Sequence, residues 1–309
     1  MKILITGASG FIGSYLFNEF SKANHEVFGL VRKKPRLKLL LDKKDRIIIS
    51  NLTDYENLNK LIPSKIDVII HAGAYNDQDT NKDIKNSYSV NIFGTRNICK
   101  IAESRKVKKL IYFSVLQVYG RELRGRISEN SKIVCDNDYS LNHFLAENVC
   151  KNYSFISKTK FAILRLGYVF GCPVQNNIDR KTLIPYLICD QAVKNKKIKL
   201  MSRGKAQRDF VSLNKLFTSI SQIIKNKTRF EIYNVVSGYS FSIKEIANIV
   251  QEEASKLFKK SIKVIYGNLN DFTNNFKTVS KLNLYKNKNE IMYELRQQIR
   301  KTLILIDEK

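Results

Sequence analysis

The sequence is poor in the features that identify disulfide-stapled, metal-binding and membrane-spanning proteins. Its five cysteines are odd in number and form no Cys-x-x-Cys pair, which indicates reduced thiols and no zinc spacing. Its three histidines are scattered, so we expect no metal site. No apolar run reaches the roughly 18 to 20 residues that a bilayer span requires. The apolar stretch 3–5 runs at once into glycines instead of a signal-peptide core, and we therefore expect a cytoplasmic protein with no membrane span.

Acidic residues are also scarce, since 28 Asp and Glu stand against 54 Lys and Arg, giving a formal net charge of +26. Such an excess first suggests nucleic acid or another polyanion as a partner. The basic residues are mostly lysines spread along the chain, however, and no nucleic-acid-binding motif accompanies them. We therefore expect no nucleic acid partner, and we interpret the charge as a compositional bias of a solvated surface that would still attract a small anionic substrate.

The remaining composition is that of a globular protein, with 309 residues, 43% of them hydrophobic and 27% charged. Apolar β-branched runs alternate with segments of helical periodicity along the first half of the chain. Strands that alternate with helices indicate an α/β fold with a doubly wound parallel sheet covered on both faces. The expected strands are 2–6, 25–31, 47–49, 68–71, 109–114 and 161–166. The expected helices are one that carries Leu16, Phe17 and Phe20 at helical spacing, and those at 55–62, 88–104 and 139–157.

The alternation weakens after Gly171, which predicts a second, smaller lobe. We expect residues 1–171 to form a dinucleotide-binding domain, to which 207–236 returns, and residues 172–309 to form mainly a substrate-binding lobe. In the second part we expect helices at 183–194, 213–225, 242–258 and 290–305, a loop and strand at 199–209, a strand at 232–236 and a polar loop at 273–288. We expect this lobe to pack on the sheet, with the ligand in the crevice between them.

A glycine turn directly follows the first expected strand. Glycines at 7, 10 and 13 let the chain turn tightly, let backbone N–H groups approach a pyrophosphate and let the next helix pack close to the strand. A turn without a ligand is the alternative. The position between a strand and a helix at the start of a βαβ unit favours dinucleotide binding.

The spacing of those glycines resembles the extended short-chain dehydrogenases, the nucleotide-sugar epimerase and dehydratase family. Further stretches resemble the family's motifs in the same order, at 51–54, 71–74, 90–95, 113–120 and 208–211. The resemblance covers nearly the whole chain. It implies a Rossmann-type sheet with a smaller C-terminal substrate-binding lobe, a nicotinamide dinucleotide cofactor, a nucleoside diphosphate sugar as substrate, and a homodimer formed through the helices 88–104 and 139–157.

The resemblance also assigns the cofactor contacts. They are Gly7, Ser9, Gly10, Phe11, Ile12, Gly13, Asn51, Leu52, Ala72, Gly73, Ala74, Tyr139 and His143. At the end of the second strand, NAD-binding proteins of this fold usually have a carboxylate, whereas this chain has Arg32 and Lys33. Cations at this position suit the 2′-phosphate of NADP. A solvated charge run is the alternative. We therefore expect NADP, with NAD as the second choice.

The family's catalytic set is a Ser or Thr, a Tyr and a Lys four residues later. Tyr139 keeps the tyrosine position, where it would transfer the proton. The Ser or Thr position falls on Val115, and Ser114 is a doubtful substitute because neighbouring residues of a strand point to opposite faces. The Lys position is His143, which lies beside Tyr139 on a helix and, with an ordinary pKa near 6.5, would carry charge only at lower pH. His143 could also be an ordinary residue of a helix face.

The substrate contacts implied by the resemblance are Tyr75, Tyr168 and Arg208. Arg208 would clamp the diphosphate, unless it forms a structural ion pair with a neighbour such as Asp209. The family's dehydratases carry an acid pair where this chain has Leu116 and Gln117, so 4,6-dehydration is not expected. We expect an NADP-dependent keto-sugar nucleotide reductase, or an epimerase and reductase combined. The alternative is a catalytically degenerate relative that binds the dinucleotide or sugar nucleotide in a structural or regulatory role.

Overall fold

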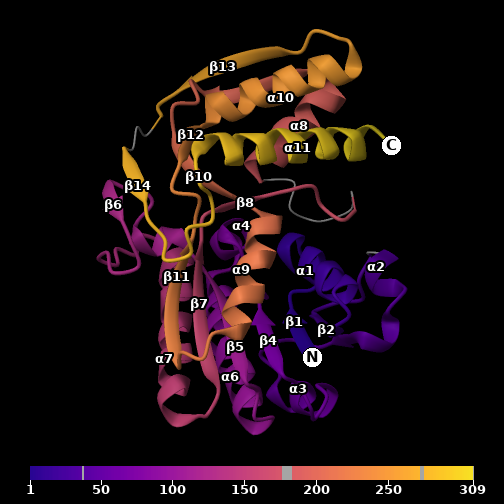
Figure 1. The fold of residues 1–309 in the computed structure, drawn as a ribbon, viewed down its shortest axis with the longest axis vertical. Helices are drawn as coiled ribbons and strands as arrows, with labels where there is room; N and C mark the ends of the chain where they lie inside the picture. The colour runs from indigo at the N-terminus through magenta and orange to yellow at the C-terminus, as the bar shows by residue number, and fades with distance from the viewer. Residues whose placement is uncertain (37, 176–182, 272–274, 309) are drawn as a thin grey trace. The chain divides into compact units, whose positions relative to one another are not determined.

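The computed structural model describes residues 1–308 except for 37, 176–182 and 272–274 (Figure 1). The chain forms two compact units. The first contains residues 1–121, 132–166 and 217–233, and the second contains residues 122–131, 167–216 and 234–309. The first unit therefore ends before the expected boundary at 171, the segment that returns to it is shorter than 207–236, and Arg208 belongs to the second unit.

The first unit is built on a seven-stranded sheet with the order β11-β7-β5-β4-β1-β2-β3. All the strand pairs from β7 to β3 are parallel. The strands are β1 (Lys2–Thr6), β2 (Glu26–Val31), β3 (Ile47–Ile49), β4 (Val68–His71), β5 (Lys109–Val115), β7 (Lys160–Leu166) and β11 (Phe230–Val235). The structure confirms the doubly wound α/β fold expected from the sequence.

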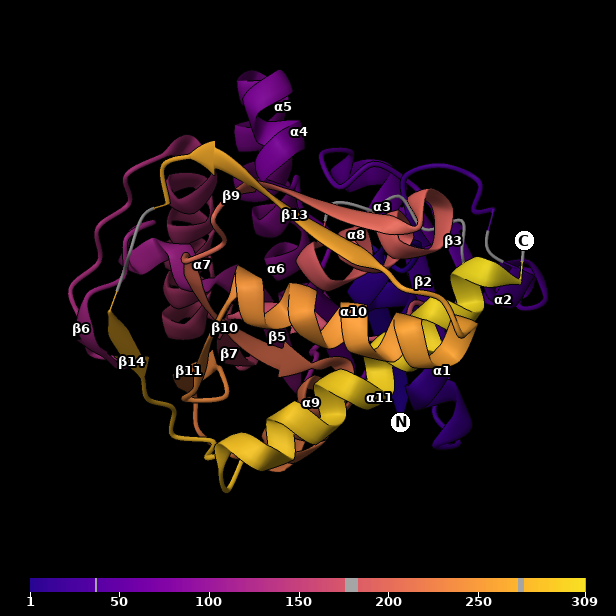
Figure 2. The same ribbon diagram turned by 90° about the horizontal axis from the view of Figure 1, so that it is seen from above.

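Helices cover both faces of this sheet, as Figure 2 shows from above. On one face, side chains of α3 (Tyr55–Leu61), α6 (Thr95–Ser104) and α7 (Asp138–Ile156) share a hydrophobic core with the strands. On the other face lie α1 (Phe11–Lys22) and α9 (Leu213–Lys225), joined by an edge-to-face contact of Phe20 with Phe217 at 4.9 Å between ring centroids. Burial on both faces explains why the strands read as continuous apolar runs in the sequence.

The connections of the first unit contain short helical segments. They are α2 (Lys38–Leu41), η1 (Lys44–Arg46), α4 (Asp77–Lys82), α5 (Ile84–Tyr88), η2 (Ser89–Gly94) and η3 (Leu116–Tyr119). The segment expected as one helix at 88–104 is helical throughout, but η2 interrupts its α-helical geometry with a π-helical turn between α5 and α6. Such segments are rare and often occur at functional sites.

The described residues of the second unit form three small sheets and three long helices. A three-stranded sheet has the order β12-β10-β8, and two two-stranded sheets pair β13 with β9 and β14 with β6. The elements are β6 (Gly125–Ile127), β8 (Tyr168–Phe170), α8 (Ile184–Asn195), β9 (Lys197–Ser202), β10 (Gln207–Ser212), β12 (Ser240–Ser242), α10 (Ile243–Phe258), β13 (Lys263–Leu269), β14 (Phe276–Thr278) and α11 (Lys288–Asp307). The loop expected at 273–288 is wrong at β14, whose three residues are too few for periodicity to reveal, and residues 273 and 274 of that expectation lie outside the described residues.

A buried ion pair ties α7 to the sheet of the first unit. Arg165 of β7 and Glu147 of α7 lie 2.7 Å apart, each with a side chain only 4% exposed. The Ser114 hydroxyl donates to Glu147, and Arg165 also donates to the Tyr119 hydroxyl at 2.8 Å. The pair therefore links β5, η3, α7 and β7 through one charged cluster.

We predict that Glu147→Gln lowers the free energy of unfolding by about 3 to 5 kcal/mol, because it leaves the Arg165 charge buried without a counterion. Denaturant titration measures this. The matched control is Glu19→Gln, which breaks the Lys22 pair at the surface and should change the free energy by at most about 0.5 kcal/mol. A loss of under about 1 kcal/mol in Glu147→Gln would show that the pair contributes little.

Candidate functional site

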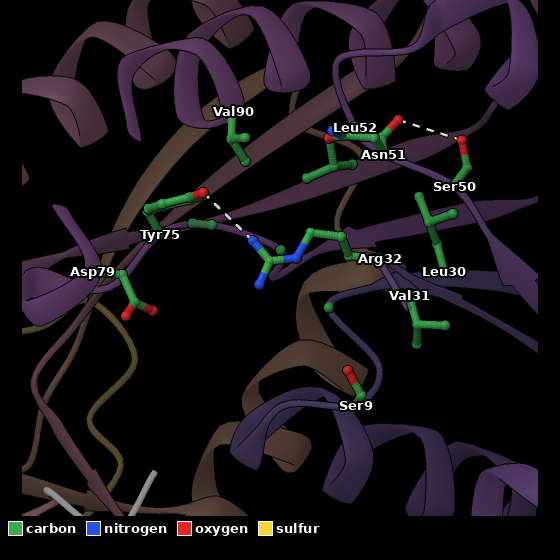
Figure 3. Close-up of a pocket in the computed structure, with 13 residues that line it drawn as sticks. Ser9, Leu30, Val31, Arg32, Ser50, Asn51, Leu52, Tyr75, Asp79 and Val90 are labelled. Carbon is green, nitrogen blue, oxygen red and sulfur yellow. Dashed lines mark hydrogen bonds between the residues drawn. The ribbon is translucent and has the colours of Figure 1, made fainter. Parts of the chain in front are cut away.

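A pocket opens at the carboxyl ends of β1, β2 and β4 in the first unit (Figure 3). This is the edge at which ligands of open α/β sheets bind. The lining residues are Gly7, Ser9, Leu30, Val31, Arg32, Ser50, Asn51, Leu52, Gly73, Ala74, Tyr75, Asp79 and Val90. Most of the expected cofactor contacts outside α1 and α7 thus line one pocket.

The glycine turn forms one wall of this pocket and leaves no room for side chains. Gly7 has a φ of +67°, and a Cβ built on Gly13 would lie 2.1 Å from the Gly7 carbonyl oxygen. Gly10 is the N-cap residue of α1 and has no side chain, so the first N–H groups of the helix receive no side-chain cap. Backbone N–H groups at a helix start, approached closely through glycines, fit the pyrophosphate of a dinucleotide.

Arg32 reaches across the pocket to Tyr75 (Figure 3). Its Nη1 donates to the Tyr75 hydroxyl at 3.5 Å, and its Cζ lies 5.8 Å from the centre of the tyrosine ring. Tyr75, expected among the substrate contacts, therefore lines the same pocket as Arg32. Lys33 is exposed and is not among the lining residues. The lining residues include one acid, Asp79, which comes from α4 and not from the end of β2.

A chain of buried hydrogen bonds runs from Gly73 at the pocket to Asn91 in η2. The Gly73 N–H donates to Thr6 Oγ1 at 2.9 Å, and the Thr95 hydroxyl donates to the Asn91 carbonyl oxygen. Between them, His71 Nδ1 lies 2.7 Å from Thr6 Oγ1 and His71 Nε2 lies 3.0 Å from Thr95 Oγ1. The Thr95 hydroxyl has one hydrogen, and it donates that hydrogen to Asn91. His71 Nε2 must therefore donate to Thr95, and Nδ1 of the neutral ring must accept from Thr6.

Asn91 extends this chain to α7. Its Oδ1 accepts from the Tyr75 N–H at 2.8 Å, and its Nδ2 donates to Asn142 at 2.8 Å. The π-helical turn thus fixes the backbone beside the pocket and the helix that carries Tyr139. The sequence places Thr6, Asn91 and Thr95 only within motifs and gives them no role. It does not single out Asn142 at all, because nothing local distinguishes such a residue from an ordinary polar one.

Tyr139 and His143 lie side by side on α7, with their rings edge to face and 4.9 Å between centroids. Tyr139 is half-buried, whereas His143 is buried, and His143 Nδ1 lies 2.9 Å from the hydroxyl of Tyr112 on β5. Burial lowers the pKa of His143 to about 4. The expectation that His143 titrates near 6.5 is therefore wrong, because the low-dielectric interior disfavours its charged form, and the residue is neutral at physiological pH.

Ser114 lies at the end of β5 and is 1% exposed. Its hydroxyl donates to Glu147, within the ion-pair cluster of Arg165. The next residue, Val115, is half-buried and lies where the resemblance places a Ser or Thr. The hydroxyl of Ser114 thus already serves a structural bond.

Arg208 and Tyr168 lie together in the second unit, on the paired strands β10 and β8. The Arg208 Cζ lies 5.2 Å from the centre of the Tyr168 ring, and its Nε is buried with no partner among the described residues. The carboxylate of Asp209 accepts instead from Ser237, Gly238 and Thr278. Asp209 is therefore engaged elsewhere, and the structural ion pair considered for Arg208 is not formed.

The part of the chain that the structure describes contains no cluster of three His, Cys, Asp or Glu residues that could hold a metal ion. None of the described helices is long and apolar enough to cross a membrane. The described site therefore consists of the glycine turn, Arg32 and Tyr75 at one end and the pair of Tyr139 and His143 on α7.

Comparison with known proteins agrees with this geometry. Residues 3–236 match the model of the NAD dependent epimerase/dehydratase family. The chain belongs to this family. It is an extended short-chain dehydrogenase of the nucleotide-sugar epimerase and dehydratase type, as the resemblance in the sequence implied.

Among curated relatives, this chain is 28% identical to GDP-6-deoxy-D-talose 4-dehydrogenase of Aggregatibacter actinomycetemcomitans. The match covers 82% of this chain and 80% of that protein. The chain is 25% identical to human dTDP-D-glucose 4,6-dehydratase, over 82% and 75% of the two chains. Among solved structures it resembles a variant of UDP-glucuronic acid 4-epimerase from Bacillus cereus, with a TM-score of 0.78, 21% identity and coverage of 100% and 99%.

The two buried histidines predict an acid-sensitive fold. Burial, with a smaller contribution from the charge that His143 would carry, lowers the pKa of His71 to about 3, and that of His143 is about 4. Unfolded histidines titrate near 6.5, so between pH 6.5 and 4 the unfolded chain binds more protons than the folded one. These groups therefore make the free energy of unfolding fall as pH drops.

We predict that His143→Gln reduces this slope by up to about 1.4 kcal/mol per pH unit, the effect of one proton, with no change of slope above pH 7.5. Denaturant titrations of both proteins from pH 4.5 to 8 measure it. Asp209, whose pKa burial raises to about 6, contributes the opposite slope equally in both proteins. Equal slopes in the two proteins between pH 4.5 and 6.5 would contradict a neutral buried His143.

Proposed function

We propose that the protein is an NADP-dependent oxidoreductase of a nucleotide-linked sugar that reduces a keto sugar, or combines epimerisation with reduction. The observation that carries the proposal is the pair on α7, in which Tyr139 lies against a buried, neutral His143. A tyrosine that donates its proton needs no permanent neighbouring cation. A tyrosine that acts as a base must be held as an anion, which such a cation would favour.

In this mechanism Tyr139 donates its phenolic proton to the carbonyl oxygen of the sugar as the carbon is reduced. NADPH, when bound, supplies the hydride. His143, next to Tyr139, binds a ribose hydroxyl in place of the family's lysine. The glycine turn and the start of α1 hold the pyrophosphate.

Arg32 supports the choice of NADP. It lines the pocket at the end of β2, and no carboxylate follows that strand. A guanidinium can meet a 2′-phosphate with charge-assisted hydrogen bonds, whereas the ribose hydroxyls of NAD are usually held by an acid. NAD is the alternative, since the Bacillus cereus structure is a complex with UDP-4-deoxy-4-fluoro-glucuronic acid and NAD.

The substrate proposal is a nucleoside diphosphate sugar whose diphosphate binds Arg208. The guanidinium of Arg208 stacks on Tyr168, and its buried Nε lacks a partner among the described residues, which leaves donor capacity for an anion. The names of the relatives, a GDP-sugar dehydrogenase and a dTDP-sugar dehydratase, support a nucleotide-linked sugar without deciding the base. We propose no 4,6-dehydration, because Leu116 and Gln117 stand at the positions of the acid pair.

A non-catalytic binding protein is the second candidate. It is favoured by Val115 in the place of the family's Ser or Thr and by the bond between Ser114 and Glu147, which occupies the nearest hydroxyl. Such a protein would bind dinucleotide or sugar nucleotide without turnover.

We predict that the wild type binds NADPH more tightly than NADH and that Arg32→Ala weakens NADPH binding roughly ten- to hundredfold, the value of a charge-assisted hydrogen bond. The affinity for NADH should be nearly unchanged. Fluorescence titration of both cofactors measures this, with Lys33→Ala as the control, because Lys33 has the same charge and does not line the pocket. Equal wild-type affinities for the two cofactors would refute the NADP assignment.

We predict that Tyr139→Phe slows NADPH oxidation by nucleotide-linked 4-keto sugars at least about 10²-fold, the usual contribution of general acid catalysis. Tyr153→Phe, which removes a hydroxyl from the same helix, should retain wild-type turnover. Full activity in Tyr139→Phe would exclude its role as proton donor. Absence of turnover with every keto-sugar nucleotide in the wild type would favour the non-catalytic candidate.

A further inference from the structure

Tyr112 carries a buried hydroxyl that the mechanism above does not use. The residue lies on β5 and is 1% exposed, and its oxygen is 2.9 Å from Nδ1 of His143. Among the described residues, His143 is the only hydrogen-bond partner recorded for this hydroxyl. The direction of this bond therefore decides which nitrogen of His143 carries the ring proton.

The two possible directions differ in what they leave buried. If Nδ1 donated to Tyr112, the phenolic hydrogen would lie in the core without an acceptor among the described residues, which is costly. If Tyr112 donates to Nδ1, both groups are satisfied by one bond. The ring of His143 is neutral, so its single proton must then reside on Nε2.

We infer that Tyr112 is a positioning residue that fixes His143 in the Nε2–H form and so makes Nε2 a hydrogen-bond donor. The consequence for binding rests on the proposed function, in which His143 stands where the family has a lysine. A neutral Nε2–H then replaces the donor capacity of the lysine ammonium without its charge. Tyr112 acts only through His143 and touches no ligand in this scheme.

His71 provides an internal reference for this inference. Its ring is also buried, and its Nε2–H form follows from a different set of partners, the hydroxyls of Thr95 and Thr6. Its ring centroid lies 5.6 Å from that of Tyr112, but no hydrogen bond joins the two in the described structure. Removing the Tyr112 hydroxyl should therefore change the protonation pattern of His143 and leave that of His71 unchanged.

The test is a long-range ¹H–¹⁵N correlation spectrum of the full chain labelled with ¹⁵N-histidine at neutral pH, in which only three histidines occur. The expected wild-type pattern for His143 is a protonated Nε2 and an unprotonated Nδ1. Tyr112→Phe should give a mixture of the two neutral forms, whereas Tyr153→Phe, which removes another hydroxyl of the same core, should retain the wild-type pattern. A protonated Nδ1 in the wild type, or an unchanged pattern in Tyr112→Phe, would overturn the inference.

The wild-type spectrum decides the matter even if Tyr112→Phe does not fold. Binding gives a second readout, because a Gln side chain can present an N–H near the position of Nε2, whereas Asn reaches only to that of Nδ1. We expect His143→Gln to bind NADPH nearly as well as the wild type and His143→Asn to bind it roughly tenfold more weakly, as for one lost hydrogen bond. If both variants bind like the wild type, Nε2–H is no cofactor donor. The proposed function then fails at this residue, while the spectrum still reports on Tyr112.

Discussion

The arrangement of the site depends on a histidine that must stay uncharged in the core. His71 connects the end of β1 to the start of α6 through Thr6 and Thr95, and each hydrogen in that chain has one acceptor. A second proton on the ring would turn Nδ1 into a donor and leave the Thr6 hydroxyl hydrogen without an acceptor in this chain. Burial lowers the pKa of His71 to about 3, which keeps the chain intact over the physiological range.

The chain has consequences beyond its own residues. Thr6 holds the N–H of Gly73 at the edge of the pocket, and Asn91 holds the N–H of Tyr75 together with Asn142 of α7. The glycine turn, the strand end after β4 and the helix of Tyr139 are thus fixed to one another within the first unit. Rigid placement of this kind is what a site needs when it must hold a long dinucleotide and a proton donor in register.

The sequence predicts the parallel sheet well because its signal is local. Runs such as 3–5 and 68–70 are continuously apolar and mostly β-branched, a pattern typical of a parallel strand that is covered on both faces. It also predicts the pocket, since the glycine turn is needed where the backbone at Gly7 and Gly13 leaves no room for a Cβ. It does not predict the bonds of His71, whose partners lie 65 and 24 residues away, or the pairing of β6 with β14, which are three residues each.

The same reason explains why the expected protonation of His143 was wrong. The sequence identifies the residue that replaces a lysine, but the pKa of a histidine depends on its burial, which arises from residues distant in the sequence, such as Tyr112 on β5. A lysine at this position would carry a permanent charge beside Tyr139, whereas the buried histidine offers a neutral donor. Under the proposed function this substitution withdraws support from a tyrosinate base and leaves the tyrosine acid unaffected. Under the proposed function, a neutral ring in place of a cation therefore favours the protonated tyrosine that reduction needs, and the reason lies in the buried contact with Tyr112.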